Sequence, residues 1–248
     1  MASASICCDA VSKRFGRTEA VAPFSATLAA GQTTALVGPS GCGKSTILRM
    51  IAGLEAPDTG TIRLGGESPK DLARRGALAM AFQDPSLLPW RTVRSNIALG
   101  AWLARRPAGN LDALISMVGL DGFADHRPAE LSGGMRQRAA IARALISDPE
   151  VLLLDEPFGA VDMITRSRLN AELPPLWRAR NATSVLVTHS VQEAVLIADR
   201  IIVLSPRPAR IVADLPVDPA CRDAGQDPGT PVFHDMTGKV LAALEGSM

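Results

Sequence analysis

The sequence predicts an α/β fold built around a parallel β-sheet. Several short apolar runs read as buried strands, and stretches with helical patterning separate them. One of these runs is followed by a glycine-rich loop and a helix, and another ends in two adjacent carboxylates. Such groups are expected at the carboxyl ends of parallel strands, which is where α/β sheets bind ligands.

The composition is that of an ordinary globular protein. The 248 residues are 47% hydrophobic, and 26 basic residues balance 25 acidic ones. This balance gives no sign of a polyanion-binding tail or of a polybasic membrane patch. No linker isolates a second domain, so we expect one domain spanning residues 1–248.

The cysteines suit a reducing compartment, and the apolar segments give no sign of a signal peptide or a membrane span. The cysteines are Cys7, Cys8, Cys42 and Cys221, and they form no C-x-x-C pair, which argues against a zinc site or a disulfide framework. The N-terminal fifteen residues hold no apolar core long enough for a secretory signal. With no run of about 18 apolar residues, the chain is not expected to span a membrane. Any role at a membrane would therefore need a partner.

The chain opens with two predicted strands. Residues 5–11 and 24–28 have strand patterning, and residues 13–17 between them read as a turn. Phe15 in this turn has two interpretations. It is either a core aromatic beside a hairpin or an exposed ring that stacks on a nucleotide base.

A phosphate-binding loop follows the next predicted strand, residues 34–37. The stretch fits the pattern G-x-x-x-x-G-K-[ST] and reads Gly38, Pro39, Ser40, Gly41, Cys42, Gly43, Lys44, Ser45, Thr46. Its glycines permit a tight turn, so that backbone N–H groups converge at the positive end of the helix predicted over residues 46–53. Lys44 would supply a cation to the β- and γ-phosphates, and the Ser45 hydroxyl can ligate Mg²⁺. The alternative is a glycine-rich turn without a ligand.

Two further elements precede a loop with apolar side chains. Residues 58–66 read as turn, strand and turn, and residues 77–82 as a buried strand that ends at Gln83. The loop at residues 84–90 then carries Leu87, Leu88 and Trp90 between two prolines. Exposed apolar groups on a loop would form a binding surface, whereas the alternative is a loop folded onto its own core.

A helical insert is predicted over about residues 92–147. Thr92 and Asn110 are expected to cap helices at residues 93–99 and 111–118. A third helix over residues 136–146 follows Ser132, Gly133 and Gly134. These small residues at a helix start suggest a second anion-binding site, which the phosphate loop in the same chain favours over the alternative that Ser132 is a simple N-cap.

An apolar strand at residues 151–154 leads into a pair of carboxylates. Asp155 would reach Mg²⁺, directly or through water, at the carboxyl end of this strand. Glu156 would point to the opposite side and act as general base for an attacking water. The alternative is a solvated acidic pair with no catalytic role.

The last third of the chain continues the alternation of helices and strands. Asp162 is expected to begin a helix that reaches about residue 173, where two prolines interrupt it. A strand at residues 184–188 ends at His189, which is either structural or in contact with the γ-phosphate. The remaining expected elements are a helix capped by Ser190, strands at residues 200–204 and 209–213, and a tail over about 215–248 with a helix at 237–244.

These motifs, in this order, resemble the nucleotide-binding subunits of ABC transporters over roughly residues 5–215. The resemblance implies a P-loop NTPase core with an antiparallel β subdomain and a helical subdomain that carries the signature motif. The matching motifs are Walker A at 38–45, the Q-loop glutamine Gln83, the signature Leu131-Ser132-Gly133-Gly134-Met135, Walker B at 151–155 with the catalytic Glu156, the D-loop at 158–162 and the switch His189. The signature motif is the discriminating one, because other P-loop ATPases lack it.

The resemblance also implies a mechanism. Two copies would face each other head to tail, with each ATP and its Mg²⁺ between one copy's Walker A and the other's residues 132–134. Gln83, Glu156 and His189 would act on the γ-phosphate, Ser45, Gln83 and Asp155 would hold the metal, and Asp162 would lie near the nucleotide. The partners would be an integral membrane permease and, indirectly, a periplasmic solute-binding protein, without nucleic acid. The expected location is the cytoplasmic face of the inner membrane, as a peripheral subunit.

Two segments resemble one branch of the family more closely than the others. The loop at residues 87–90 and the stretch at residues 204–211 look like the importers of nitrate, sulfonates and taurine, and importers of thiamine precursors look similar. ABC ATPases that act on nucleic acid or ribosomes remain a less favoured alternative, because they usually carry two units or a long insert. The departures are Phe15 in place of tyrosine, Met135 in place of glutamine, and the two prolines at 174–175.

Overall fold

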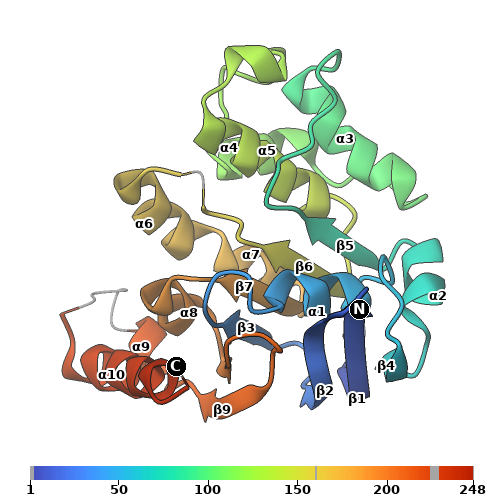
Figure 1. The fold of residues 1–248 in the computed structure, drawn as a ribbon. Helices are drawn as coiled ribbons and strands as arrows, with labels where there is room; N and C mark the ends of the chain where they lie inside the picture. The colour runs from blue at the N-terminus through green and yellow to red at the C-terminus, as the bar shows by residue number, and fades with distance from the viewer. Residues whose placement is uncertain (1–2, 160, 224–228, 248) are drawn as a thin grey trace.

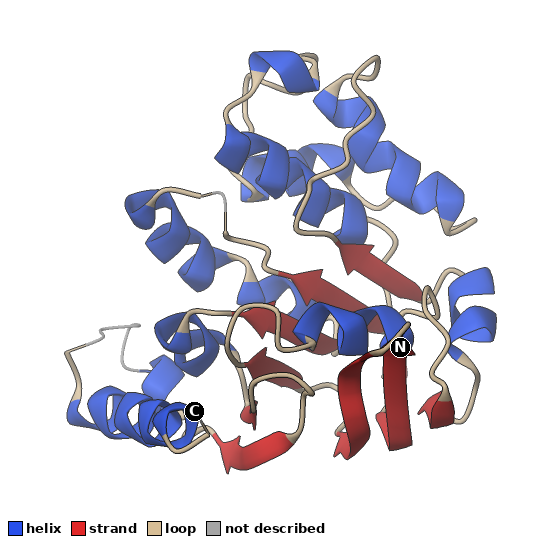
Figure 2. Ribbon diagram, viewed as in Figure 1, coloured by secondary structure: helices blue, strands red, loops and turns tan. Residues whose placement is uncertain are grey.

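The computed structural model describes residues 3–159, 161–223 and 229–247. Within these ranges the strands gather in two sheets with helices around them (Figure 2), which confirms the predicted α/β class.

The larger sheet forms the centre of the molecule. In the described part of the chain it has six strands in the order β5-β6-β7-β3-β8-β9. Their bounds are Thr33–Val37 for β3, Leu78–Ala81 for β5, Val151–Asp155 for β6, Thr183–Thr188 for β7, Arg200–Leu204 for β8 and Ile211–Pro216 for β9. The first five strands in this order, β5, β6, β7, β3 and β8, pair in parallel, and β9 pairs with β8 in the antiparallel sense. The residues that follow β3, β5, β6 and β7 therefore meet at one edge of the sheet.

A smaller antiparallel sheet contains the first two strands of the chain (Figure 1). It has the order β2-β1-β4 among the described residues, with bounds Ile6–Phe15 for β1, Thr18–Leu28 for β2 and Thr59–Leu64 for β4. The predicted turn at residues 13–17 is wrong in extent, since only Gly16 and Arg17 separate β1 from β2. The end of β1 was missed because Lys13 is polar, which a hydrophobicity pattern reads as exposed. In the structure Lys13 is buried, and its Nζ lies 2.7 Å from Oε1 of Glu55.

The helices complete the element order. Their bounds are Lys44–Ile51 for α1, Pro69–Arg74 for α2, Val93–Leu103 for α3, Leu111–Met117 for α4, Gly133–Leu145 for α5, Met163–Glu172 for α6, Pro174–Ala179 for α7, Val191–Ile197 for α8, Ala220–Asp223 for α9 and Pro231–Glu245 for α10, with a 3₁₀ turn at Pro128–Glu130. Thr92, Asn110, Ser132 and Ser190 cap their helices as predicted, because each side chain accepts a hydrogen bond from the backbone N–H three residues later.

Several helices differ from the sequence prediction or add detail to it. Helix α10 starts six residues earlier than expected, with Pro231 in its first turn and Phe233, Met236 and Val240 buried along one face. The break between α6 and α7 falls at Leu173, and the prolines occupy the first turn of α7, where a missing N–H costs little. Helices α2 and α9 were not predicted. None of the described helices has the length and apolar character needed to cross a membrane.

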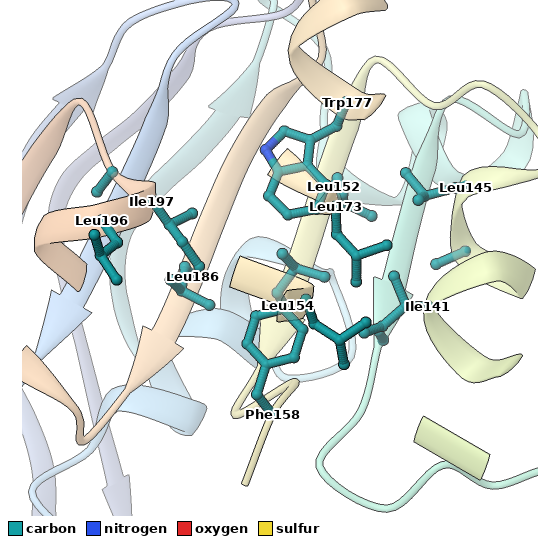
Figure 3. Close-up of a cluster of buried hydrophobic side chains, with 14 of the residues drawn as sticks. Ile141, Leu145, Leu152, Leu154, Phe158, Leu173, Trp177, Leu186, Leu196 and Ile197 are labelled. Atoms are coloured by element: carbon teal, nitrogen blue, oxygen red, sulfur yellow. The ribbon is translucent and has the colours of Figure 1, made fainter. Parts of the chain in front are cut away.

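The central sheet separates two hydrophobic cores because successive side chains of a strand point to opposite faces. On β6, Leu152 and Leu154 belong to the core beneath α5, α7 and α8, which also holds Phe158 and Trp177 (Figure 3). Val151 and Leu153 belong to the other core, which lies around α1 and reaches the three-stranded sheet. Both faces of the sheet are thus covered, and the edge at the strand ends is left to carry polar groups.

Candidate functional site

The loop at residues 38–43 joins β3 to α1. Gly41 has φ +70° and Gly43 has φ +128°, which are backbone conformations that glycine adopts without strain. A Cβ at Gly43 would lie 2.7 Å from the backbone oxygen of Ala20, so this position also has no room for a side chain. The predicted strand, loop and helix are therefore present, with the loop at the N-terminal end of α1.

Lys44 lies under this loop and is 5% exposed. Its Nζ donates hydrogen bonds to the backbone oxygens of Gly38 (2.7 Å) and Pro39 (2.8 Å). Cys42 is buried as well, with its Sγ 3.9 Å from the same Nζ. Cys42, Gly38 and Pro39 thus support the loop from behind and do not line the cavity in front of it.

Ser45, in the first turn of α1, is in direct contact with Asp155, the last residue of β6. The Ser45 hydroxyl donates a hydrogen bond of 2.9 Å to Oδ1 of Asp155, whose side chain is 3% exposed. Burial raises the pKa of Asp155, and the Ser45 hydrogen bond opposes this shift only in part. A buried carboxylate that is short of compensating charge would gain from a nearby cation.

Gln83, Glu156 and His189 come together from three different strand ends. Oε2 of Glu156 lies 3.4 Å from Nε2 of Gln83 and 3.4 Å from Nδ1 of His189. Glu156 has φ +45°, a conformation that is uncommon for a side chain of this size. The two adjacent carboxylates have different partners: Asp155 bonds to Ser45, whereas Glu156 lies between Gln83 and His189.

Glu193 lies directly behind the His189 turn and was not anticipated as a site residue. It is 4% exposed, and its Oε2 accepts a 2.7 Å hydrogen bond from the Thr188 hydroxyl, which in turn accepts one from the backbone N–H of Ser190. Burial raises the pKa of Glu193 to about 7. The two neighbours of His189 in sequence are therefore fixed through one buried carboxyl group.

These groups open onto a cavity of about 810 Å³ at the edge of the sheet. Its lining residues are Phe15, Thr18, Ala20, Ser40, Gly41, Gly43, Lys44, Ser45, Thr46, Gln83, Glu156, His189 and Arg207. Phe15 is half exposed, which favours the stacking interpretation over the core interpretation. Thr18, Ala20 and Arg207 were missed from sequence, because contact between the hairpin, the 205–210 loop and the phosphate loop is tertiary.

Ser132, Gly133, Gly134 and Asp162 do not line this cavity. Ser132 caps α5 and Asp162 caps α6. The two caps are close to each other, since a Cβ at Gly134 would lie 3.6 Å from a methyl group of Val161. Met135 packs against the main core, and Ala160 of the predicted D-loop lies outside the described residues.

The loop after Gln83 is clamped by two helices of the insert. Gln137 and Arg143 of α5 donate to backbone oxygens at Phe82, Pro85 and Ser86. From α3, the fully buried Asn96 bonds to both the N–H (2.7 Å) and the oxygen (3.1 Å) of Leu88. The expected exposure of this loop is right for Trp90, which is 69% exposed, and wrong for Leu87 and Leu88, which are partly buried.

Comparison with known proteins identifies the family. The profile described as ABC transporter matches residues 21–159, which is more than half of the chain. The chain belongs to the ABC transporter family. The taurine import ATP-binding protein TauB of Jannaschia sp. is 40% identical over 241 residues, covering 92% of this chain and 88% of the relative. The aliphatic sulfonates import ATP-binding protein SsuB 1 of Burkholderia lata is 46% identical over 207 residues, covering 84% of this chain.

The match to the sulfonate relatives is partial in length. The chain spans 62–64% of the length of the first three of them. The solved structure of the ATP-binding cassette MJ0796, a dimer in a post-hydrolysis state with ADP and Pi, superposes with a TM-score of 0.76 at 28% identity. That superposition covers 86% of this ABC family member and 99% of the cassette, which confirms the predicted ABC ATPase fold.

The site residues fit a magnesium nucleotide. No three His, Cys, Asp or Glu side chains of the described residues gather into a metal site of their own. The hydroxyl of Ser45, the carboxylate of Asp155 and the amide oxygen of Gln83 are oxygen donors, the type that Mg²⁺ prefers when substrate phosphates complete its coordination. The raised pKa of Asp155 is consistent with a carboxylate placed for such a cation.

Proposed function

We propose that this chain is the ATP-hydrolysing subunit of a membrane importer for sulfonates such as taurine. The observation that carries the proposal is the cavity at the sheet edge. The phosphate loop, the Ser45–Asp155 pair and the cluster of Gln83, Glu156 and His189 all face it or support it. The relatives named as sulfonate and taurine import ATP-binding proteins supply the substrate class.

The cavity has a place for each part of ATP. The half-exposed ring of Phe15 offers a flat apolar face to the base. The backbone N–H groups of residues 40–46 and the Nζ of Lys44 receive the phosphates. Since Lys44 is bound to loop carbonyls, its charge is already positioned when a phosphate arrives.

The chemistry assigned to the chain is in-line attack of water on the γ-phosphorus. Glu156 takes a proton from that water, the water oxygen bonds to the γ-phosphorus, and the bond from the γ-phosphorus to the β,γ-bridging oxygen breaks, which releases ADP and inorganic phosphate. Gln83 and His189 contact Oε2 of Glu156 and hold it in place beside the γ-phosphate position. Mg²⁺, when held by Ser45, Asp155 and Gln83, supplies positive charge to the phosphate oxygens.

A second copy completes the site. Ser132, Gly133 and Gly134 lie outside the cavity of their own chain, next to Asp162, and would cover the nucleotide of a partner copy in a head-to-tail dimer. A dimeric structure of a related cassette with ADP and Pi supports this arrangement.

The membrane partner is a permease at the cytoplasmic face. Trp90 is the exposed apolar group on the clamped loop that follows Gln83, so it is the candidate contact for the permease. A periplasmic solute-binding protein would deliver the solute to that permease. The cavity then lies directly behind the loop that carries the contact.

Growth and co-purification test the proposal together. A strain that lacks this gene should fail to grow on taurine or alkanesulfonates as sole sulfur source and should grow normally on sulfate. The tagged chain should co-purify with an integral membrane permease. Normal growth on sulfonates together with purification free of any permease would contradict an importer. A strain that grows normally on sulfonates but fails to grow when a thiamine precursor is the only source of thiamine would instead support the importers of thiamine precursors.

A further inference from the structure

The phosphate cavity holds a second basic side chain that the motifs do not account for. Arg207 lies in the loop between β8 and β9, and it lines the cavity together with Phe15 and Lys44. Its Nε and one Nη donate hydrogen bonds of 3.0 and 2.7 Å to the backbone oxygen of Gly41. Arg207 therefore touches the phosphate loop itself, at a different carbonyl from the two that Lys44 holds.

The loop that carries Arg207 is fixed at both ends. Ser205 and Arg210 close it, because the Ser205 N–H donates to the Arg210 oxygen (2.9 Å) and the Arg210 N–H donates to the Ser205 hydroxyl (3.1 Å). Ala209 bonds through its N–H to Ala20 (3.0 Å) and through its oxygen to Ala22 (3.2 Å), both on β2. The loop thus joins the two sheets at the rim of the cavity, so Arg207 cannot drift away from it.

The charge and donors of Arg207 suit a phosphate. A guanidinium has five N–H donors and stays protonated in proteins, and only two of its donors are used on Gly41. Lys44 shows the same pattern, a cation held on loop carbonyls next to the cavity. Among the formally charged side chains that line the cavity, these two are positive and Glu156 is negative.

We propose that Arg207 is a nucleotide-binding residue that fixes Gly41 and presents its remaining N–H groups to the phosphates. This inference rests on the proposed nucleotide site and adds a second cation to it. Arginine suits the task because its rigid fork can hold a carbonyl oxygen and a phosphate oxygen at the same time. Lysine at this position would keep the charge and lose the planar fork.

The test compares two arginines of the same loop. Arg207→Gln and Arg210→Gln remove the same charge, but Arg210 is exposed and does not line the cavity. Affinities for ATP, ADP and adenosine would be measured by displacement of a fluorescent ATP analogue. We expect Arg207→Gln to weaken ATP and ADP about tenfold or more, as loss of a charge-assisted hydrogen bond does, and to leave adenosine unchanged. Arg210→Gln should match wild type for all three.

Three results would overturn the inference. They are wild-type ATP affinity in Arg207→Gln, an equal loss for adenosine, and an equal loss in Arg210→Gln. If Arg207→Gln fails to fold, phenylglyoxal labelling of the wild-type chain decides: ATP and ADP should protect Arg207, adenosine should not, and Arg210 should react at one rate throughout. Equal labelling of Arg207 with and without ATP would refute the contact. Absence of nucleotide binding in the wild type would refute the proposed function instead.

Discussion

At the scale of single residues, Glu156 is the proposed general base. Its Oε2 is 3.4 Å from both Gln83 and His189, so replacement of one oxygen by an amide changes the base and little else. We expect Glu156→Gln to bind ATP as the wild type does and to hydrolyse it about 10²- to 10⁴-fold more slowly, the usual contribution of a general base. Single-turnover hydrolysis and a binding titration would measure the two effects separately.

The matched control is Glu245→Gln, the same change on the exposed end of α10. It should hydrolyse ATP at the wild-type rate. Turnover of Glu156→Gln within tenfold of wild type would remove Glu156 as the base.

The buried carboxyl group of Glu193 is expected to make the free energy of unfolding depend on pH. Its pKa is raised from 4.5 to about 7 because it is buried, so the folded state binds a proton more readily than the unfolded state. The free energy of unfolding therefore falls as pH rises from about 4.5 to 7, and the full penalty is present above that range. Relative to wild type, Glu193→Gln should become more stable by up to about 3 kcal/mol between pH 5 and pH 8, given about 1.4 kcal/mol per pKa unit.

Urea melts at several pH values would measure this difference, with Glu245→Gln as the exposed control. A stability difference between Glu193→Gln and wild type that stays constant with pH would mean that Glu193 is ionised in the folded state throughout. Arg166, whose charge opposes the shift, and Glu156, whose charge adds to it, are the charged neighbours that such a result would implicate.

At the scale of elements, the loop after Gln83 has an interior anchor and an exposed tip. Asn96→Ala would leave the N–H of Leu88 without its partner, at about 1–3 kcal/mol, whereas the Leu88 oxygen would still accept a hydrogen bond from the N–H of Arg91. We expect a melting temperature that is several degrees lower and faster amide hydrogen exchange at Leu88. Hydrogen exchange read by mass spectrometry would localise the change to this loop.

Trp90→Glu is the counterpart on the same loop. Because Trp90 is 69% exposed, the variant should melt like wild type and lose co-purification with the permease. A lowered melting temperature with unchanged permease binding would show that Trp90 packs inward and would favour the core interpretation.

At the scale of the whole molecule, residues 132–134 lie outside the cavity of their own chain, which supports the proposal that a second copy completes the site. We expect MgATP to bind to a monomer and to be hydrolysed only in a dimer. Ser132→Arg should leave nucleotide affinity unchanged and abolish turnover, since a bulky cation at the start of α5 would prevent closure on the partner. Size exclusion and specific activity at several protein concentrations would measure the coupling.

A mixed dimer sharpens this test. Pairing Ser132→Arg with Lys44→Ala leaves one composite site with an intact phosphate loop and an intact signature, so activity should return in part. Ala108→Arg, an exposed change in the same helical insert, is the control for added charge. Normal hydrolysis by Ser132→Arg at all concentrations would contradict the composite site.

The sequence by itself was sufficient for the α/β class, the central strands and the positions of the motifs. Each of these depends on local patterns: apolar runs for β3, β6 and β7, glycines for the loop at residues 38–43, and capping side chains such as Ser132. A hydrophobicity pattern could not reveal that Lys13 is buried within a strand, because its ion pair with Glu55 joins residues far apart in the chain.

Only the tertiary structure decided which groups share the cavity. Parallel pairing of β5, β6 and β7 brings Gln83 and His189, which are more than a hundred residues apart in sequence, to the same carboxylate oxygen of Glu156. The seating of Ala209 against β2 brings Arg207 to Gly41 in the same way. Long-range contacts of this kind leave no periodic trace in a sequence, since they depend on strand order and loop closure and not on the residues next to them.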